Sequence, residues 1–127
     1  MTIHRVPATD LADAASLLKG DSPRLIFKHS PTCGISAMAY TEVSVFADEH
    51  PDVPVLLVDV IAHRALSRQL AVELGLPHAS PQVILVAGGR PLWSVSHGAV
   101  TGQAIGRALA LALPDDAEGE DGPRTVR

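Results

Sequence analysis

The stretch that decides the fold is Phe27-Lys28-His29-Ser30-Pro31-Thr32-Cys33-Gly34-Ile35-Ser36. It begins within the apolar run Leu25-Ile26-Phe27, which predicts a strand, and passes through a short polar turn. The turn delivers the only cysteine of the chain, Cys33, to the start of a helix that we expect to run to about Glu49. The apolar residues expected on the inward face of this helix are Ile35, Met38, Ala39, Val43 and Phe46.

Cys33 is the candidate catalytic residue. A thiol at a helix N-terminus faces unpaired backbone N–H groups and the positive end of the helix dipole, and both favour the reactive thiolate. Three residues on, where a dithiol oxidoreductase carries its second cysteine, the chain has Ser36. Cys33 can therefore attack a disulfide and form a mixed disulfide, but no internal thiol can resolve it. The alternative is a buried structural cysteine.

Ser36 is the second candidate catalytic residue. Its hydroxyl could exchange a hydrogen bond with the sulfur of Cys33 from one helical turn away, or Ser36 could be an ordinary first-turn serine. The residues that flank the thiol, Thr32 and Gly34, are candidate substrate-binding residues because they shape the turn and leave one side of the sulfur open.

The remaining pattern predicts helices and strands in alternation. Residues 1–7 are compatible with a short strand, and Thr9 or Asp10 can cap a helix that ends at Gly20. The other predicted elements are a strand at 24–28, a buried strand at 53–60, a helix at 64–74, a strand at 82–87, a turn at Gly88-Gly89, an edge strand at 91–96 and a helix capped by Thr101. This order indicates an α/β, thioredoxin-like fold with a central mixed sheet of four strands, or five with residues 1–7, flanked by helices.

A second part of the candidate site precedes the third core strand, at Ser80-Pro81. If the Ser80–Pro81 peptide bond is cis, its neighbouring backbone groups lie beside the thiol and can pair with an extended substrate. The alternative is a trans proline in a turn. Lys28 and His29 are further candidates, because a cation near the sulfur favours its charged form. Strand alternation puts these two side chains on opposite faces, so at most one is expected to act directly.

Four other polar or aromatic residues have two interpretations each. Asp59 is either a buried carboxylate for proton transfer or a strand-end residue that caps the next helix. His78 and His97 lie near the ends of core strands and could approach the active face or stay at the surface. Trp93, on the edge strand, fits packing better than substrate contact. The six histidines lack the short spacing of a metal site, so no metal is predicted.

Composition narrows the function further. The chain has 127 residues and a net charge of −4, with ten Lys and Arg and no basic cluster, so nucleic-acid binding is not expected. We expect one domain, residues 1–113, and an acidic, disordered tail, residues 114–127. The longest apolar runs are too short to cross a bilayer. A single cysteine and no signal-peptide pattern suit a reducing cytosol, which predicts a cytoplasmic protein.

The sequence also resembles the monothiol bacilliredoxins of the YtxJ-like family over roughly residues 8–113. The segments that carry this resemblance are Phe27–Ala39, Val58-Asp59-Val60-Ile61, His78-Ala79-Ser80-Pro81-Gln82-Val83-Ile84-Leu85 and Ser96-His97. The resemblance implies a thioredoxin fold and removal of bacillithiol, the co-substrate, from mixed disulfides on client proteins. It implies that Cys33 is the nucleophile, that Ser36 replaces a resolving cysteine and that Pro81 is the cis-proline. No tightly bound cofactor is implied.

Two positions depart from that family pattern. Gly34 follows the cysteine where proline is usual, and Gly98 stands where a bulky residue often follows the Ser-His pair. The first departure brings Cys33-Gly34-Ile35-Ser36 close to the C-G-F-S motif of monothiol glutaredoxins, some of which carry iron–sulfur clusters. The sequence therefore leaves three functions open: a bacillithiol-removing reductase, a cluster carrier that uses Cys33 and an external thiol, and a redox-inactive interaction module.

Overall fold

The computed structural model describes residues 3–5, 18 and 20–112. The helix expected to begin at Thr9 or Asp10 lies outside the described residues, as does the acidic tail expected at 114–127. The observations below concern the described part of the chain.

The centre of the molecule is a mixed five-stranded sheet in the order β1-β3-β2-β4-β5. The strands are β1 (Ile3–Arg5), β2 (Arg24–His29), β3 (Val55–Asp59), β4 (Gln82–Ala87) and β5 (Arg90–Ser96). β3 is parallel to both β1 and β2, whereas β4 is antiparallel to β2 and β5. The short strand expected within residues 1–7 is confirmed as β1, and the strand at 90–96 lies at the edge as predicted.

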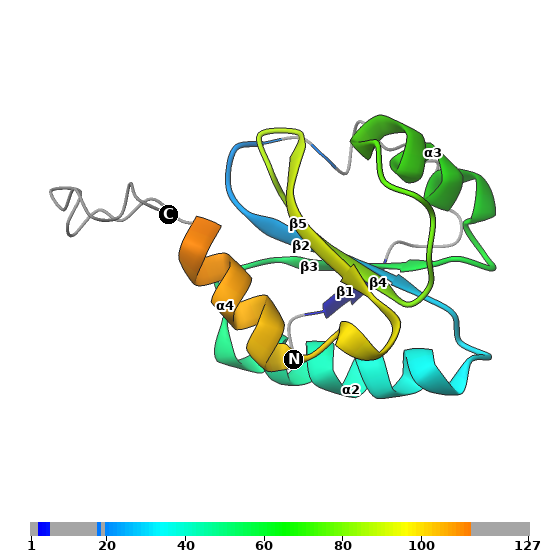
Figure 1. The fold of residues 1–127 in the computed structure, drawn as a ribbon, viewed down its shortest axis with the longest axis horizontal. Coiled ribbons are helices and arrows are strands. Elements are labelled where there is room, and N and C mark those ends of the chain that lie inside the picture. Colours follow the sequence, from blue (N-terminus) through cyan, green and yellow to red (C-terminus); the bar gives the residue numbers. More distant parts are fainter. Residues whose placement is uncertain (1–2, 6–17, 19, 113–127) are drawn as a thin grey trace, which may run out of the picture.

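Helices cover both faces of this sheet, as Figure 1 shows. α2 (Gly34–Glu49) and α4 (Gly102–Ala112) pack on one face, and α3 (Arg64–Leu74) packs on the other; a short 3₁₀ turn, η1 (His97–Ala99), joins β5 to α4. Strand alternation sends Leu25 and Phe27 into the core under α2 and α4, and Ile26 into the core under α3. The predicted thioredoxin-like architecture is confirmed.

Three local signals work as the sequence predicts. Gly88 and Gly89 both have positive φ, 60° and 75°, which is the backbone of a tight two-residue hairpin turn. Gly75 ends α3 in the left-handed conformation, with φ 66°. The hydroxyl of Thr101 accepts the N–H of Ala104 at 3.1 Å and so caps α4.

The inward face of α2 differs from the prediction. Ala39, Val43 and Phe46 are buried as expected, but Ile35 is 48% exposed and Met38 is 71% exposed. The buried stripe instead begins at Ser36, which has no exposed area. Position 36 is in phase with the buried residues Ala39, Val43 and Phe46, so Ile35 and Met38 lie on the neighbouring face, which is exposed. The prediction for Ile35 and Met38 was therefore wrong.

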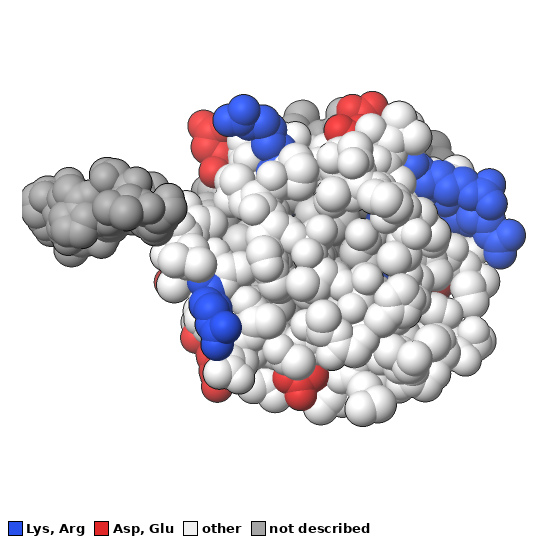
Figure 2. All heavy atoms as spheres, viewed as in Figure 1, with Lys and Arg blue, Asp and Glu red and all other residues white. Residues whose placement is uncertain are grey.

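The visible face of the molecule carries few charges, as Figure 2 shows, and its Lys and Arg side chains lie at separate places on the rim, one of them at the end where α3 lies. Within the described ranges, no helix combines the length and the apolar character that a membrane span requires.

Candidate functional site

Cys33 is the N-cap residue of α2, with an extended backbone at φ −109° and ψ 127°. Its N–H donates to the C=O of Ser30 at 3.1 Å, and its C=O accepts the N–H of Ala37 at 3.0 Å. The thiol is free and partly exposed, and both chain neighbours, Thr32 and Gly34, are exposed. The alternative of a fully buried structural cysteine therefore does not describe this residue.

Ser36 is buried under the turn that carries Cys33. Its Oγ accepts the N–H of Ser30 at 3.0 Å and lies 2.8 Å from Nδ1 of His29. Across the described part of the chain, the hydrogen bonds of this hydroxyl go to His29 and Ser30 rather than to the sulfur of Cys33. Ser36 thus connects the turn to the end of β2. This role is neither the hydrogen bond to the sulfur of Cys33 nor the ordinary first-turn serine that the sequence suggested.

Lys28 and His29 point to opposite faces of the sheet, as strand alternation predicts. His29 reaches toward α2, where its ring also lies 5.3 Å from the ring of Tyr40. Lys28 is fully buried on the side of α3, and its Nζ lies 3.2 Å from Nδ1 of His78. Burial lowers the pKa of Lys28 from 10.5 to about 8. Of the two, His29 is the one connected through Ser36 to the turn of Cys33.

The Ser80–Pro81 peptide bond is cis. Lys28 of β2 pairs with Gln82 of β4, so the next position along each strand brings Pro81 opposite His29, at the edge of the sheet where the cysteine turn begins. The C=O of Pro81 accepts the N–H of His97 at 2.9 Å, which ties η1 to the same edge. Register alone therefore gathers the proline loop, the cysteine turn and η1 at one end of the sheet.

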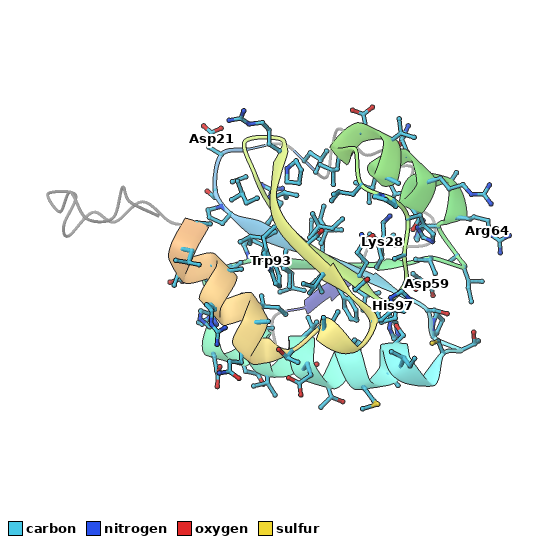
Figure 3. All side chains as sticks on the ribbon, viewed as in Figure 1. Asp21, Lys28, Asp59, Arg64, Trp93 and His97 are labelled. Atoms are coloured by element: carbon cyan, nitrogen blue, oxygen red, sulfur yellow. The ribbon has the colours of Figure 1, made fainter. Side chains whose placement is uncertain are left out.

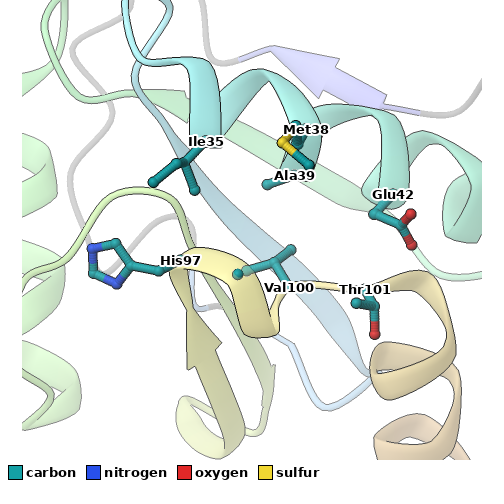
Figure 4. Close-up of a pocket in the computed structure, with 8 residues that line it drawn as sticks. Ile35, Met38, Ala39, Glu42, His97, Val100 and Thr101 are labelled. Atoms are coloured by element: carbon teal, nitrogen blue, oxygen red, sulfur yellow. The ribbon is translucent and has the colours of Figure 1, made fainter.

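An apolar surface groove lies between α2 and the η1–α4 connection and holds about 370 Å³ (Figure 4). Ile35, Met38, Ala39 and Glu42 of α2 line one side, and His97, Gly98, Val100 and Thr101 line the other. Glu42 closes one end by accepting the N–H of Gly102 at 2.8 Å. Sequence reasoning missed this groove because it placed Ile35 and Met38 in the core. A polar residue at position 36, in phase with Val43, was the available signal.

The structure also places the residues for which the sequence left two interpretations. Asp59 accepts the N–H groups of Ile61 and Ala62 at 2.8 and 3.0 Å, which agrees with a strand-end cap. Figure 3 shows Lys28 and Asp59 toward the end of the molecule where Arg64 lies. Trp93 packs against the core under α2 and α4. His97 lines the groove, whereas His78 lies on the face of α3. In the ranges that the structure describes, no three His, Cys, Asp or Glu residues gather as a metal site requires.

Comparison with solved structures places the fold among thioredoxins. A protein proposed to be an oxidoreductase with a thioredoxin fold matches at 25% identity and a TM-score of 0.76, covering 85% of this chain and 94% of its own. Thioredoxin from Trypanosoma brucei brucei matches at 16% identity and a TM-score of 0.69, covering 85% and 88%. Fasciola hepatica thioredoxin matches at 19% identity and a TM-score of 0.60, covering 87% and 97%.

A protein-family comparison is more specific than the fold. The model of the family described as monothiol bacilliredoxin BrxC matches residues 8–105, a span that contains the cysteine turn, the cis-proline and His97. This span is most of the chain, and it holds one cysteine where a dithiol protein would hold two. This thioredoxin-fold chain belongs to the monothiol bacilliredoxin BrxC family.

Proposed function

We propose that this protein is a cytoplasmic monothiol thiol–disulfide oxidoreductase that removes bacillithiol, or a similar low-molecular-weight thiol, from mixed disulfides on client proteins. The observation that carries the proposal is the position of the only cysteine. Cys33 is partly exposed at the N-cap of α2, between the exposed residues Thr32 and Gly34. Membership of the monothiol bacilliredoxin family supports bacillithiol as the thiol.

The first step transfers the small thiol to the enzyme. The thiolate of Cys33 attacks the bacillithiol sulfur of the mixed disulfide, the old S–S bond breaks, and the client sulfur leaves as a thiolate that takes up a proton. A new disulfide between Cys33 and bacillithiol forms. The attacking species is the thiolate, and its carrier Cys33 is the N-cap residue of α2.

The second step needs an external thiol. Ser36 occupies the position from which a second cysteine would attack, and its hydroxyl is buried and hydrogen-bonded. The thiolate of a second bacillithiol attacks the bacillithiol sulfur on the enzyme, which releases bacillithiol disulfide and regenerates the Cys33 thiolate. Each cycle therefore consumes one thiol and leaves the enzyme unchanged.

The neighbouring residues fit roles in holding the substrate. Thr32 and Gly34, the chain neighbours of Cys33, are exposed, and a Cβ added at Gly34 would meet no atom within 4 Å. The backbone at Ser80, before the cis-proline Pro81, is suited to pair with an extended segment that carries the mixed disulfide. We assign His29 and Lys28 to support of the turn and of the proline loop, through Ser36 and His78 respectively.

One assay tests the reaction and the thiol together. The protein is incubated with one client that carries bacillithiol and the same client carrying glutathione, and Cys33 is analysed by mass spectrometry. We expect the bacillithiol adduct on Cys33 and the free client thiol. Cys33→Ser is the control and should leave both clients modified. Transfer of glutathione alone would contradict the assignment of bacillithiol, and no transfer from either client would contradict the reductase function.

The sequence Cys33-Gly34-Ile35-Ser36 favours a second candidate, a carrier in which Cys33 and an external thiol hold an iron–sulfur cluster between two chains. Anaerobic purification separates the two functions, because a carrier would be brown with visible absorption and a reductase colourless. A redox-inactive interaction module is the third hypothesis. It predicts that iodoacetamide alkylates Cys33 no faster than a free cysteine at any pH, whereas the reductase proposal predicts faster alkylation at neutral pH.

A further inference from the structure

A second pocket lies on the face of the sheet opposite the apolar groove, between the start of α3 and the loop that leads to the cis-proline. It holds about 240 Å³. The residues that line it are Val60, Ile61, Arg64, Ser67, Arg68 and His78. This lining contains no acidic side chain, and more of its surface is polar than in the groove of Figure 4.

Two arginines contribute positive charge to the lining of the pocket. Arg64 and Arg68 are four residues apart on α3, so their side chains lie on the same side of the helix. Both are exposed. Figure 3 places Arg64 at the end of the molecule where Figure 2 shows basic side chains. Two guanidinium groups at one pocket are well suited to oxygen anions, which they bind through paired N–H groups.

Ser67 supplies an independent observation. This residue is 1% exposed and lines the pocket, and its Oγ is buried without a hydrogen-bond partner in the described part of the chain. An unpaired buried hydroxyl costs about 1–3 kcal/mol, so a ligand that accepts its O–H would recover that cost. In the sequence, Ser67 comes directly before Arg68 and three residues after Arg64.

Lys28 adds a buried cation next to His78, and His78 lines the pocket as a neutral imidazole. The Lys28 ammonium can only donate, so Nδ1 of His78 accepts its hydrogen bond at 3.2 Å and Nε2 of His78 carries the proton as a donor. The pKa of His78 is lowered, first by desolvation and then by the positive charges of Lys28 and Arg68. The N-cap of α3, His63, makes no side-chain cap, and the helix start adds its own positive dipole end.

We propose that this pocket binds a small oxygen anion, a phosphate or a carboxylate, held by Arg64 and Arg68 and by the hydroxyl of Ser67. Anion binding itself does not rest on the proposed reductase function, because the pocket residues lie on the other face of the sheet from Ser36 and the groove; only the second of its two sources rests on that function. The anion has two possible sources: a free metabolite, or the anionic part of the low-molecular-weight thiol that reacts at Cys33.

The binding test is a titration of the full chain with inorganic phosphate at constant ionic strength, followed by amide chemical shifts. We expect saturable shifts at Ser67, Arg68 and His78. The double variant Arg64→Gln/Arg68→Gln should weaken binding at least about tenfold, as the loss of charge-assisted hydrogen bonds requires. Ser67→Ala should weaken it by a smaller factor. Arg107→Gln is the matched control, because Arg107 is also an exposed helical arginine but lies on α4.

Non-saturating shifts, or equal affinity of the double variant and the Arg107→Gln control, would overturn the proposal. Circular dichroism of each variant separates lost binding from lost folding. The Cys33→Ser variant should bind phosphate as the native chain does, so a failure of the reductase function leaves this test intact.

A kinetic arm distinguishes the two sources once phosphate is shown to bind. If the pocket receives the anionic part of the thiol, phosphate raises the KM for bacillithiol and leaves the rate with the uncharged thiol β-mercaptoethanol unchanged. If the pocket takes a free metabolite, phosphate changes neither the KM for bacillithiol nor the rate with β-mercaptoethanol. Both results support an anion site and differ only in its physiological ligand.

Discussion

The Oγ of Ser36 lies 2.8 Å from Nδ1 of His29. This contact joins the first turn of α2 to the last residue of β2, and the same Oγ accepts the N–H of Ser30. The position at which a dithiol relative carries its resolving sulfur is here a buried anchor of the loop. The residue that stands in place of a second thiol therefore also connects the turn that carries Cys33 to the end of β2.

Ser36→Ala should destabilise the protein. The substitution removes the hydroxyl that contacts Nδ1 of His29 and accepts the N–H of Ser30, and the loss of a buried hydrogen-bond partner costs about 1–3 kcal/mol. Urea unfolding measures the difference in the free energy of unfolding. Ser44→Ala is a control, because the hydroxyl of Ser44 only returns a hydrogen bond to Tyr40 within the same helix. An equal effect of the two substitutions would contradict the anchoring role.

Ser36→Cys should convert the chain to dithiol chemistry. Attack of the introduced thiolate on the disulfide between Cys33 and bacillithiol releases bacillithiol as a thiol and leaves an internal disulfide between Cys33 and the introduced cysteine. The introduced thiol supplies both the attacking sulfur and the proton that the released bacillithiol takes up, so this step needs no second bacillithiol. We expect mass spectrometry to detect the internal disulfide and almost no bacillithiol adduct after reaction with a modified client. Persistence of the adduct would show that the buried position 36 does not let a sulfur reach Cys33.

Most of the fold could be predicted from the sequence because its signals are local. Continuous apolar runs predict β3 and β4, Gly88-Gly89 predicts the turn between β4 and β5, and Gly75 predicts the end of α3. The candidate site at the sheet edge follows from the fold, since the register of β2 and β4 brings Pro81 beside the cysteine turn.

The sequence could not predict the contacts that depend on tertiary packing. Ile35 and Met38 have the spacing of a core stripe, but the stripe passes through position 36 instead, where a polar residue is buried with hydrogen bonds to His29 and Ser30. The proposed anion pocket could not be predicted either, because Arg64 and Arg68 look like ordinary surface residues until the structure shows that they line a pocket together with Ser67, whose Oγ is buried without a hydrogen-bond partner in the described part of the chain.

The revised inward face of α2 predicts a contrast between two substitutions. Met38→Ala should change the free energy of unfolding by less than about 0.5 kcal/mol, because the side chain is 71% exposed. Val43→Ala should cost about 2 kcal/mol, because Val43 is fully buried and the loss of its methyl groups leaves a cavity. Chemical unfolding of both variants checks the contrast. A large effect at Met38 would restore the original prediction for this face.

Gly34→Ala should stabilise the protein by about 0.4–1 kcal/mol. Gly34 is the first residue of α2, its φ is not in the left-handed region, and an added Cβ meets no atom within 4 Å. Alanine then reduces the freedom of the unfolded chain at no cost to the folded one. Thermal unfolding measures the gain. Gly75→Ala serves as the opposite case, because its φ of 66° should make alanine destabilising there.

Lys28→Met should stabilise the protein at pH 7 and remove one component of its pH dependence. Burial lowers the pKa of Lys28 from 10.5 to about 8, so below pH 8 the folded state holds a buried ammonium at a free-energy cost of at most about 3 kcal/mol. Between pH 8 and 10.5 the unfolded chain binds more protons at this position than the folded one, and stability rises with pH. Methionine keeps the length of the side chain and has no charge to bury.

The measurement is the difference in the free energy of unfolding between Lys28→Met and the native chain, taken by urea at several pH values. The variant should be more stable at pH 7, and its advantage should shrink steadily as the pH rises from 8 to 10.5. Other groups that titrate in this range cancel in the difference, since both chains carry them. A difference that stays constant across this range would mean that Lys28 keeps its ordinary pKa, and that its contact with His78 compensates the burial of its charge.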